Sequence, residues 1–341
     1  MGVYITARDE KREWNNFVSQ SNGSIFHLWE WGEVIEECLK QRKTFFVSRG
    51  KNGKINGILP FFFKSTLRKN KLISLPCTGF VDVLAKNPEV KKALLEAAFR
   101  FATETEAQLK IYNSEKLKQL PEPFCQKESL LSNYLLRTDG TYQDIFDNKL
   151  GRSKRREIRE IKKAGIEIKK ANRNDLGQFY KMHLRMMKKL GVLPLPKLAF
   201  ELIIDNFGKY SLFMKSIVEG EAKAYMWNFI YGEKIYLWRI AYQRGPSKDN
   251  LYYQALIEES IKIACNDKYI RLADFGCAVP GGGHAYVKER WSSSPLQVYL
   301  ISQCGSKEKE EFSKHKVRES VLQRSPPFIF DILATYFPNL F

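Results

Sequence analysis

The residues that could do chemistry gather in one stretch, RLADFGCAVPGGGHAYVKERWSSSP, at residues 271–295. An apolar run ends in DFG at 274–276, three glycines follow, and Lys288 then stands between two aromatic residues. An ammonium group can stabilise the negative charge that develops on oxygen during acyl transfer. We therefore predict Lys288 as a catalytic residue, with Asp274 and Tyr286 shaping its pocket. A surface lysine extended along apolar neighbours is the alternative.

The glycine triplet, residues 281–283, raises the question of a phosphate site. Phosphate cradles need backbone amides that converge at a helix N-terminus. The segment that follows, HAYVKERW, lacks a helix start signal and leads to a strand predicted at 297–302. We therefore expect a tight or flexible connection here, because glycine tolerates positive φ angles. Its predicted role is to bring Lys288 to the site.

A second candidate phosphate loop, QRGPS at 243–247, lies between a predicted strand (234–241) and a predicted helix (250–265). Acetyl-CoA-dependent N-acetyltransferases hold a pyrophosphate on backbone amides at this strand–loop–helix position. Here the loop has one glycine, followed by a proline without an N–H group, which weakens the match. The candidate substrate-binding residues of this loop and its flanking elements are Trp238, Arg239, Gln243, Arg244 and Tyr253.

A basic helix is predicted within residues 141–165, with a strand after it. Ile158 and Ile161 mark its buried face, and four arginines share another face. These arginines either form a solvated surface or contact RNA or nucleotide phosphates. They are Arg152, Arg155, Arg156 and Arg159.

The composition limits the class of protein. The net charge of +18 favours polyanionic partners, whether RNA, nucleotides or anionic lipid. The six cysteines include no C-x-x-C pair and the four histidines have no ligand spacing, so we predict no metal site and no disulfide framework. The N-terminus has no signal-peptide pattern, and no run of about 18 apolar residues is present. We expect a cytoplasmic protein that performs direct transfer, since no motif for a covalent nucleophile is present.

The predicted elements form two series of the same order: helices, an antiparallel meander, a helix and a last strand. A length of 341 residues also favours two domains. We predict an α/β (α+β) fold made of a duplicated unit, with domains at 1–140 and 141–304. Residues 305–341 form a charged tail that ends in the apolar PPFIFDILATYFPNLF, which either packs on the protein or lies on a membrane.

Several segments together resemble the FemAB-like family of aminoacyl and acyl transferases. The most specific are NLYYQALIEESIKIACNDKYIRLADFG (250–276) and GGGHAYVKERW (281–291), the second being similar to the family pattern G-x-(Y/F)-x-F-K-x-x-W. Val287 stands where that pattern has phenylalanine. Three further segments are similar to family helices and the early tryptophan motif: KRREIREIKKAGIEI, FYKMHLRMMKKLGV and SIFHLWEWGEVIEE.

This resemblance implies two GNAT-like (N-acyltransferase-like) domains and transfer of an acyl or aminoacyl group to an amine of a cell-envelope precursor, related to peptidoglycan or polysaccharide. It implies acyl-CoA or aminoacyl-tRNA as co-substrate and no tightly bound cofactor. It assigns Lys288 to stabilising the transition state and Lys188 or Lys189 to substrate phosphates. The tail resembles that of an exopolysaccharide- and envelope-associated subset. The alternatives are a non-catalytic RNA-binding protein and a scaffold at the inner membrane surface.

Overall fold

The computed structural model describes residues 2–6, 10–65, 69–74, 78, 80–117, 120–243, 250–305, 320–326 and 329–330. The chain divides into two compact units. The first contains Met1–Asn133 and Leu296–Lys307, and the second contains Tyr134–Pro295 and Glu308–Phe341. The sequence-based boundaries were placed at 140 and 304. The segment from Leu296 is the main difference, since it belongs to the first unit.

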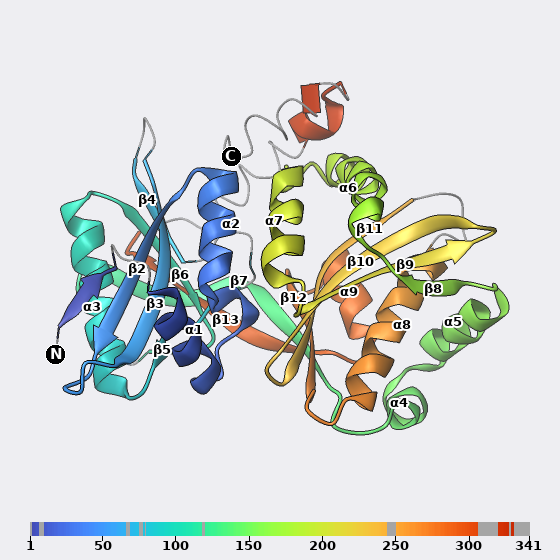
Figure 1. The fold of residues 1–341 in the computed structure, drawn as a ribbon, viewed down its shortest axis with the longest axis horizontal. Helices are drawn as coiled ribbons and strands as arrows, with labels where there is room; N and C mark the ends of the chain where they lie inside the picture. The colour runs from blue at the N-terminus through green and yellow to red at the C-terminus, as the bar shows by residue number, and fades with distance from the viewer. Residues whose placement is uncertain are drawn as a thin grey trace. The chain divides into compact units, whose positions relative to one another are not determined.

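The first unit is a mixed sheet with helices packed on it (Figure 1). Its strand order is β1-β2-β3-β4-β6-β13, and β5 pairs with β3. The neighbours are antiparallel except for the parallel pair β4 and β6. Its strands are β1 (Val3–Ile5), β2 (Arg42–Arg49), β3 (Ile55–Lys64), β4 (Lys71–Ile73), β5 (Leu84–Ala85), β6 (Gln108–Asn113), the first part of β7 (Phe124–Arg137) and β13 (Ser294–Gln303). Its helices are α1 (Lys11–Gln20), the 3-10 turn η1 (Ile25–His27), α2 (Trp29–Leu39) and α3 (Pro88–Glu104).

Both faces of the first sheet are buried by aromatic residues that alternate along β2. Phe45 stacks on Trp14 of α1 with 4.7 Å between ring centroids, whereas Phe46 belongs to the core under α3. Successive side chains of a strand point to opposite faces, so this alternation requires helices on both sides. The apolar run TFFV of β2 (44–47) therefore needs both helix layers.

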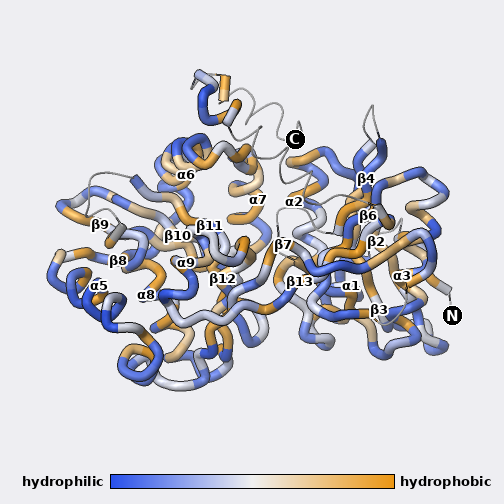
Figure 2. The backbone as a smooth tube through the Cα atoms, turned by 180° about the vertical axis from the view of Figure 1, so that it is seen from behind, coloured by the Kyte–Doolittle hydropathy of each residue, from blue (hydrophilic) through white to orange (hydrophobic). Residues whose placement is uncertain are grey.

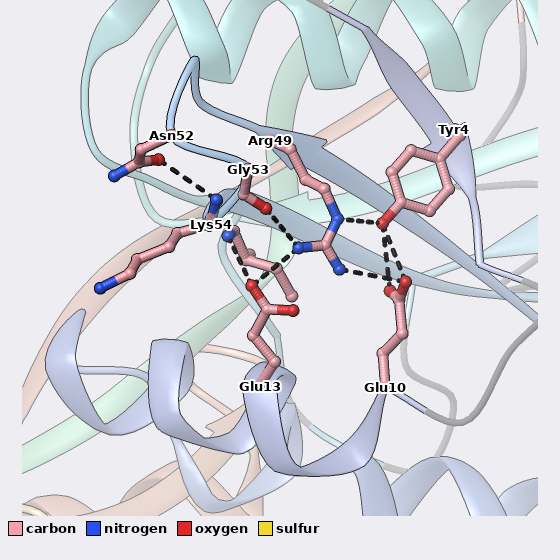
Figure 3. A network of polar contacts seen from close by, with 8 residues as sticks. Tyr4, Glu10, Glu13, Arg49, Asn52, Gly53 and Lys54 are labelled. Carbon is pink, nitrogen blue, oxygen red and sulfur yellow. Dashed lines mark hydrogen bonds and ion pairs between the residues drawn. The ribbon is translucent and has the colours of Figure 1, made fainter.

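A polar cluster centred on Arg49 ties β1, α1 and the β2–β3 hairpin together (Figure 3). Its guanidinium group donates to the Tyr4 hydroxyl (2.6 Å), Glu13 Oε1 (2.8 Å), Glu10 Oε1 (3.1 Å) and the Gly53 carbonyl (2.6 Å). The pKa of Arg49 is raised, because these hydrogen bonds outweigh its partial burial. With four hydrogen bonds made within the protein, Arg49 serves the fold.

We expect Arg49→Met to lower the free energy of unfolding by about 1–2 kcal/mol, because several charge-assisted hydrogen bonds are lost at once. Urea denaturation measures the change. The control is Lys92→Met, which removes only an exposed i,i+4 pair with Glu96 and should change stability by about 0.5 kcal/mol or less. Equal stability of both variants and the wild type would contradict this role of Arg49.

The second unit repeats this plan with the strand order β7-β12-β11-β10-β9-β8. β8–β11 are antiparallel neighbours and β11 is parallel to β12. Its further strands are β8 (Glu167–Lys170), β9 (Ser211–Val218), β10 (Glu221–Tyr231), β11 (Lys234–Tyr242) and β12 (Leu272–Ala278). Its helices are α4 (Tyr142–Asp144), the π-helical segment η2 (Ile145–Lys149), α5 (Arg152–Lys163), the 3-10 turn η3 (Arg173–Asp175), α6 (Leu176–Leu190), α7 (Lys197–Phe207), α8 (Asn250–Asn266) and α9 (Gly283–Glu289).

The duplication predicted from the sequence is visible in the element order. The series β1-α1-α2-β2-β3-β4-α3-β6 corresponds to β8-α6-α7-β9-β10-β11-α8-β12, and each series ends in a parallel pair after three antiparallel ones. The second sheet is also covered on both faces. Met226 of β10 packs in the core with α8, and its neighbour Trp227 packs against Phe200 of α7.

Two sequence-based expectations about helices are wrong. The helix predicted within residues 141–165 is broken into α4, η2 and α5. Ile145 and the extended Leu150 are both buried in the core, whereas a continuous helix would place their side chains on different faces. The segment after the glycine triplet, expected as an irregular connection, forms the helix α9, whose role is described below.

The described part of the tail packs on the protein. Leu322 and Phe330 are buried, and the Gln323 side chain donates a 3.2 Å hydrogen bond to the Lys189 carbonyl at the end of α6. Hydrophobic and hydrophilic segments alternate along this part of the backbone (Figure 2). The remaining tail residues lie outside the described ranges. Among the helices that are described, none is long and apolar enough to cross a membrane.

Candidate functional site

Lys288 lies on α9 and is held by the end of β12. Its Nζ donates hydrogen bonds to the carbonyl oxygens of Gly276 (2.7 Å) and Cys277 (2.8 Å). Successive carbonyls of a regular strand point in opposite directions. Gly276 has a φ of +71°, which breaks this alternation and lets both oxygens reach one ammonium group. The backbone conformation of Gly276 in the DFG sequence therefore positions the two carbonyl oxygens that bind the Lys288 ammonium group.

The two parallel strands at this site separate along their length. β11 and β12 pair from Lys234↔Leu272 to Tyr236↔Asp274, although β11 continues to Tyr242 and β12 to Ala278. The carbonyls that Lys288 contacts belong to the part of β12 beyond this pairing. Ligands of open parallel sheets bind beyond the carboxyl ends of the strands, and this is such an end.

The electrostatics of Lys288 follow from its surroundings. Burial lowers its pKa to about 8, although the nearby Cys277 and Asp274 act in the opposite direction. The Cys277 thiol stays neutral at this pH, because burial raises its pKa to about 12. The Lys288 ammonium also lies 5.6 Å from the centre of the Tyr134 ring, and the Tyr134 hydroxyl donates to Glu289 Oε1 at 3.3 Å.

α9 forms although its sequence carries no helix start signal. Its N-cap is Gly282, in an extended conformation without a capping side chain. Burial of Ala285 and Trp291 in the core of the second unit supplies the stabilisation that local sequence does not. A seven-residue helix depends on such packing, because short isolated helices are unstable in water.

The other two predicted catalytic residues have different surroundings. Asp274 accepts a 2.8 Å hydrogen bond from the Gly276 backbone N–H, so it stabilises the turn that exposes the two carbonyls. Tyr286 is 62% exposed, and the Arg290 guanidinium lies 5.9 Å from its ring centre. Asp274 and Lys288 thus both contact the backbone of Gly276, whereas Tyr286 faces solvent.

The predicted substrate-binding residues of β11 and α8 divide between two faces of the sheet. The β10–β11 register pairs Trp227 with Arg239 and Asn228 with Leu237, which leaves Trp238 as an extra residue. The Trp238 ring lies 5.8 Å from that of Phe200 on α7. Tyr253 lies on the α8 side instead, where its ring is 4.5 Å from that of Tyr242.

Arg239 belongs to the α6 side. Burial lowers the pKa of His183 on α6 to about 3, and the positive charge of Arg239 acts in the same direction.

The remaining predicted substrate-binding residues lie at the end of α6 and after β11. Lys188 is half-buried and Lys189 is exposed, and both lie in the last turn of α6. Gln243 is exposed after β11, and Arg244 lies outside the described residues.

The four arginines predicted to contact phosphates lie on α5 in two kinds of surroundings. Arg152, Arg156 and Arg159 are exposed, and Arg156 pairs with Glu160. Arg155 is half-buried and donates to the Asp147 carbonyl at 2.7 Å. Lys154 was not among the predicted site residues, and it is buried. Its burial could have been predicted from its spacing of four and seven residues from Ile158 and Ile161. This spacing places the lysine on the apolar face of the helix.

The chain is similar over nearly its whole length to solved structures. A crystal structure of FemX matches with a TM-score of 0.65 at 13% identity, over 92% of this chain and 99% of that chain. A tandem GNAT protein from the clavulanic acid biosynthesis pathway matches with a TM-score of 0.51 at 12% identity, over 90% and 99%. The chain has a FemAB-like double GNAT fold.

A third structure with this double GNAT fold is the C-terminal domain of a putative lysylphosphatidylglycerol synthetase from Agrobacterium fabrum. It matches with a TM-score of 0.56 at 9% identity, over 90% of this chain and 95% of that chain. No protein-family model and no curated protein sequence matches the chain. At these identities the likeness establishes the fold alone.

Within this double GNAT fold, the described residues include no group of three or more histidine, cysteine, aspartate or glutamate side chains placed to hold a metal ion. Of the candidate phosphate loop at 243–247, residues 244–247 lie outside the described ranges. The described site therefore consists of the lysine, the two carbonyls and the separating strands.

Proposed function

We propose that the chain transfers an acyl or aminoacyl group to an amine of a cell-envelope precursor related to peptidoglycan or polysaccharide. The observation that carries this proposal is the hydrogen bonding of Lys288 to two successive carbonyls beyond the paired part of β12. The double GNAT fold supports a transferase. One neighbour is named a putative lysylphosphatidylglycerol synthetase, which supports an amino-acid donor and an envelope acceptor.

The proposed reaction is direct attack of the neutral amine on the donor carbonyl. A carbon–nitrogen bond forms, the carbon–sulfur bond of acyl-CoA or the carbon–oxygen bond of aminoacyl-tRNA breaks, and the proton of the amine leaves with the thiol or hydroxyl group. Two N–H groups of Lys288 donate to the β12 carbonyls. Its third is directed to the developing oxyanion, which a fixed positive charge stabilises most in the transition state.

The exposed arginines of α5 provide a contact for the phosphates of the donor or acceptor. Arg152, Arg156 and Arg159 are exposed on one helix of a chain with a net charge of +18. Binding through such contacts weakens steeply with salt concentration. The reaction belongs to the cytoplasm, where both donors occur.

The test supplies each donor separately with envelope-precursor amines and detects the new amide by mass spectrometry. We expect one donor to be consumed and one amide to form. Salt-sensitive RNA binding without consumption of either donor would overturn the transferase and favour a non-catalytic RNA-binding protein.

We expect Gly276→Ala to lower activity about tenfold and stability by about 1–2 kcal/mol. An added Cβ meets nothing within 4 Å, so the cost is backbone strain at positive φ, and relief of that strain moves the carbonyls. The matched control is Gly232→Ala in the β10–β11 turn, where φ is +57° and the space is equally open. It should lose similar stability and keep its activity. Equal activities of the two variants, measured beside urea denaturation, would contradict this assignment.

A further inference from the structure

Lys154 of α5 lies in a buried polar cluster that reaches the helix carrying Lys288. Its side chain is 2% exposed. Its Nζ donates to Gln254 Oε1 on α8 (2.8 Å) and to Glu157 Oε1 (3.2 Å) and lies 4.3 Å from the centre of the Trp291 ring. The Trp291 indole N–H donates to the same Gln254 oxygen at 2.8 Å. One amide oxygen therefore joins the lysine to the tryptophan.

Trp291 is in turn joined directly to Lys288. The Trp291 backbone N–H donates to the Lys288 carbonyl at 2.9 Å, where α9 ends. A neighbouring contact supports the same junction, since Arg290 forms an ion pair with Glu157 at 2.5 Å. α5 and α8 thus hold the C-terminal end of α9 through side chains.

We propose that Lys154 and Gln254 are positioning residues, which fix Trp291 and so hold Lys288 on the two β12 carbonyls. The inference rests on the function proposed above for Lys288. Its structural part, the placing of the Lys288 amine, can be measured without any assay of transfer.

Packing alone does not require a lysine at this place. Ile158 and Ile161 fill the same helix face with apolar groups, and replacing a buried charge by an apolar residue of similar size is often neutral or stabilising. Burial lowers the pKa of Lys154 to about 8, which reflects the cost of holding a charge there. The cation over the indole ring and the shared amide oxygen fix the angle of Trp291, which an apolar contact would leave free.

The experiment measures the titration of the Lys288 amine by its reaction with acetic anhydride over a pH series, followed by mass spectrometry of the Lys288 peptide. The groups facing Lys288 are Asp274 and Cys277 of β12 and Tyr134 of β7, with Glu289 beyond the tyrosine. Those that act on Lys154 are Glu157, Glu258 and Arg290. The variants Lys154→Met and Gln254→Leu leave the groups around Lys288 unchanged.

We expect the wild-type midpoint near pH 8 and an upward shift of about one unit or more in both variants, since a loosened α9 returns the amine to solvent. We also expect kcat to fall about tenfold with KM nearly unchanged. Arg49→Met is the control, because it destabilises the first unit and should leave the Lys288 midpoint in place.

Folded Lys154→Met and Gln254→Leu proteins with the wild-type midpoint would overturn the positioning role. A shift as large in Arg49→Met would also overturn it, because general destabilisation would then explain the effect. If the midpoint shifts in the two variants but the wild type consumes neither donor, the proposed function fails and the positioning of Lys288 stands.

Discussion

Replacing Lys288 by methionine is expected to lower kcat by about 10²–10³-fold with little change in substrate binding. The donor carbonyl is neutral before attack and its oxygen carries negative charge in the transition state, so the ammonium acts mainly on the transition state. Methionine keeps most of the apolar stem of the side chain, is one atom shorter, and forms no hydrogen bonds to the Gly276 and Cys277 carbonyls. Steady-state rates of amide formation with the donor that the wild type uses measure the loss.

The matched control is Lys215→Met in the same unit. Lys215 is also partly buried and pairs with Asp175 at 2.7 Å, on β9 rather than at the separating strands. It should keep its turnover rate. A Lys288→Met protein that is folded and turns over at the wild-type rate would remove Lys288 from the mechanism, and an equal loss in Lys215→Met would point to general destabilisation.

The second large effect is on pH dependence. We expect kcat/KM to fall about tenfold for each pH unit above about pH 8, because the Lys288 ammonium, whose pKa burial lowers to about 8, loses its charge there. The charge is present below this pKa and is lost as the pH rises through it. The acceptor amine reacts only when neutral, so its own titration gives a rising limb, and the assay uses an acceptor whose amine pKa lies below about 8, so that this limb ends before the falling limb begins. The profile of kcat/KM should therefore be bell-shaped.

A kcat/KM that rises through pH 8 instead of falling would identify a different role for Lys288. A lysine that acts as a general base must be neutral, so the rate would rise through pH 8 and then stay level. Tyr134 has a raised pKa and the Cys277 thiol a pKa of about 12, so neither neighbour explains a falling limb at pH 8. Lys154 has a pKa of about 8 as well, so assignment of the limb requires the Lys288 variant.

The sequence predicts the layers and the repeat well, because those depend on local patterns. Alternating residues such as Phe45 and Phe46 define strands with two buried faces, and Gly191 ends α6 in the left-handed conformation that it favours. α9 could not be predicted in this way. Its seven residues are helical because Ala285 and Trp291 are buried by elements distant in sequence.

In the candidate site, too, some features depend on local sequence and others on contacts between residues distant in sequence. Lys288 and Asp274 come from one short stretch of sequence, and both side chains hydrogen-bond to the backbone of Gly276. Gln254 is 100 residues from Lys154 and 37 from Trp291, and contacts at such separations leave no local pattern. The two faces of β11 were also unpredictable, since the extra residue at Trp238 changes which side chains lie together.

The measurement that tests the central claim most directly is the pH dependence of amide formation by Lys288→Met, compared with the wild type from about pH 6.5 to 9.5. If the charge of Lys288 stabilises the transition state, the variant is slow throughout this range. It keeps the rising limb of the acceptor amine and lacks the falling limb near pH 8. A variant that retains the wild-type falling limb, or the wild-type rate, would contradict the account.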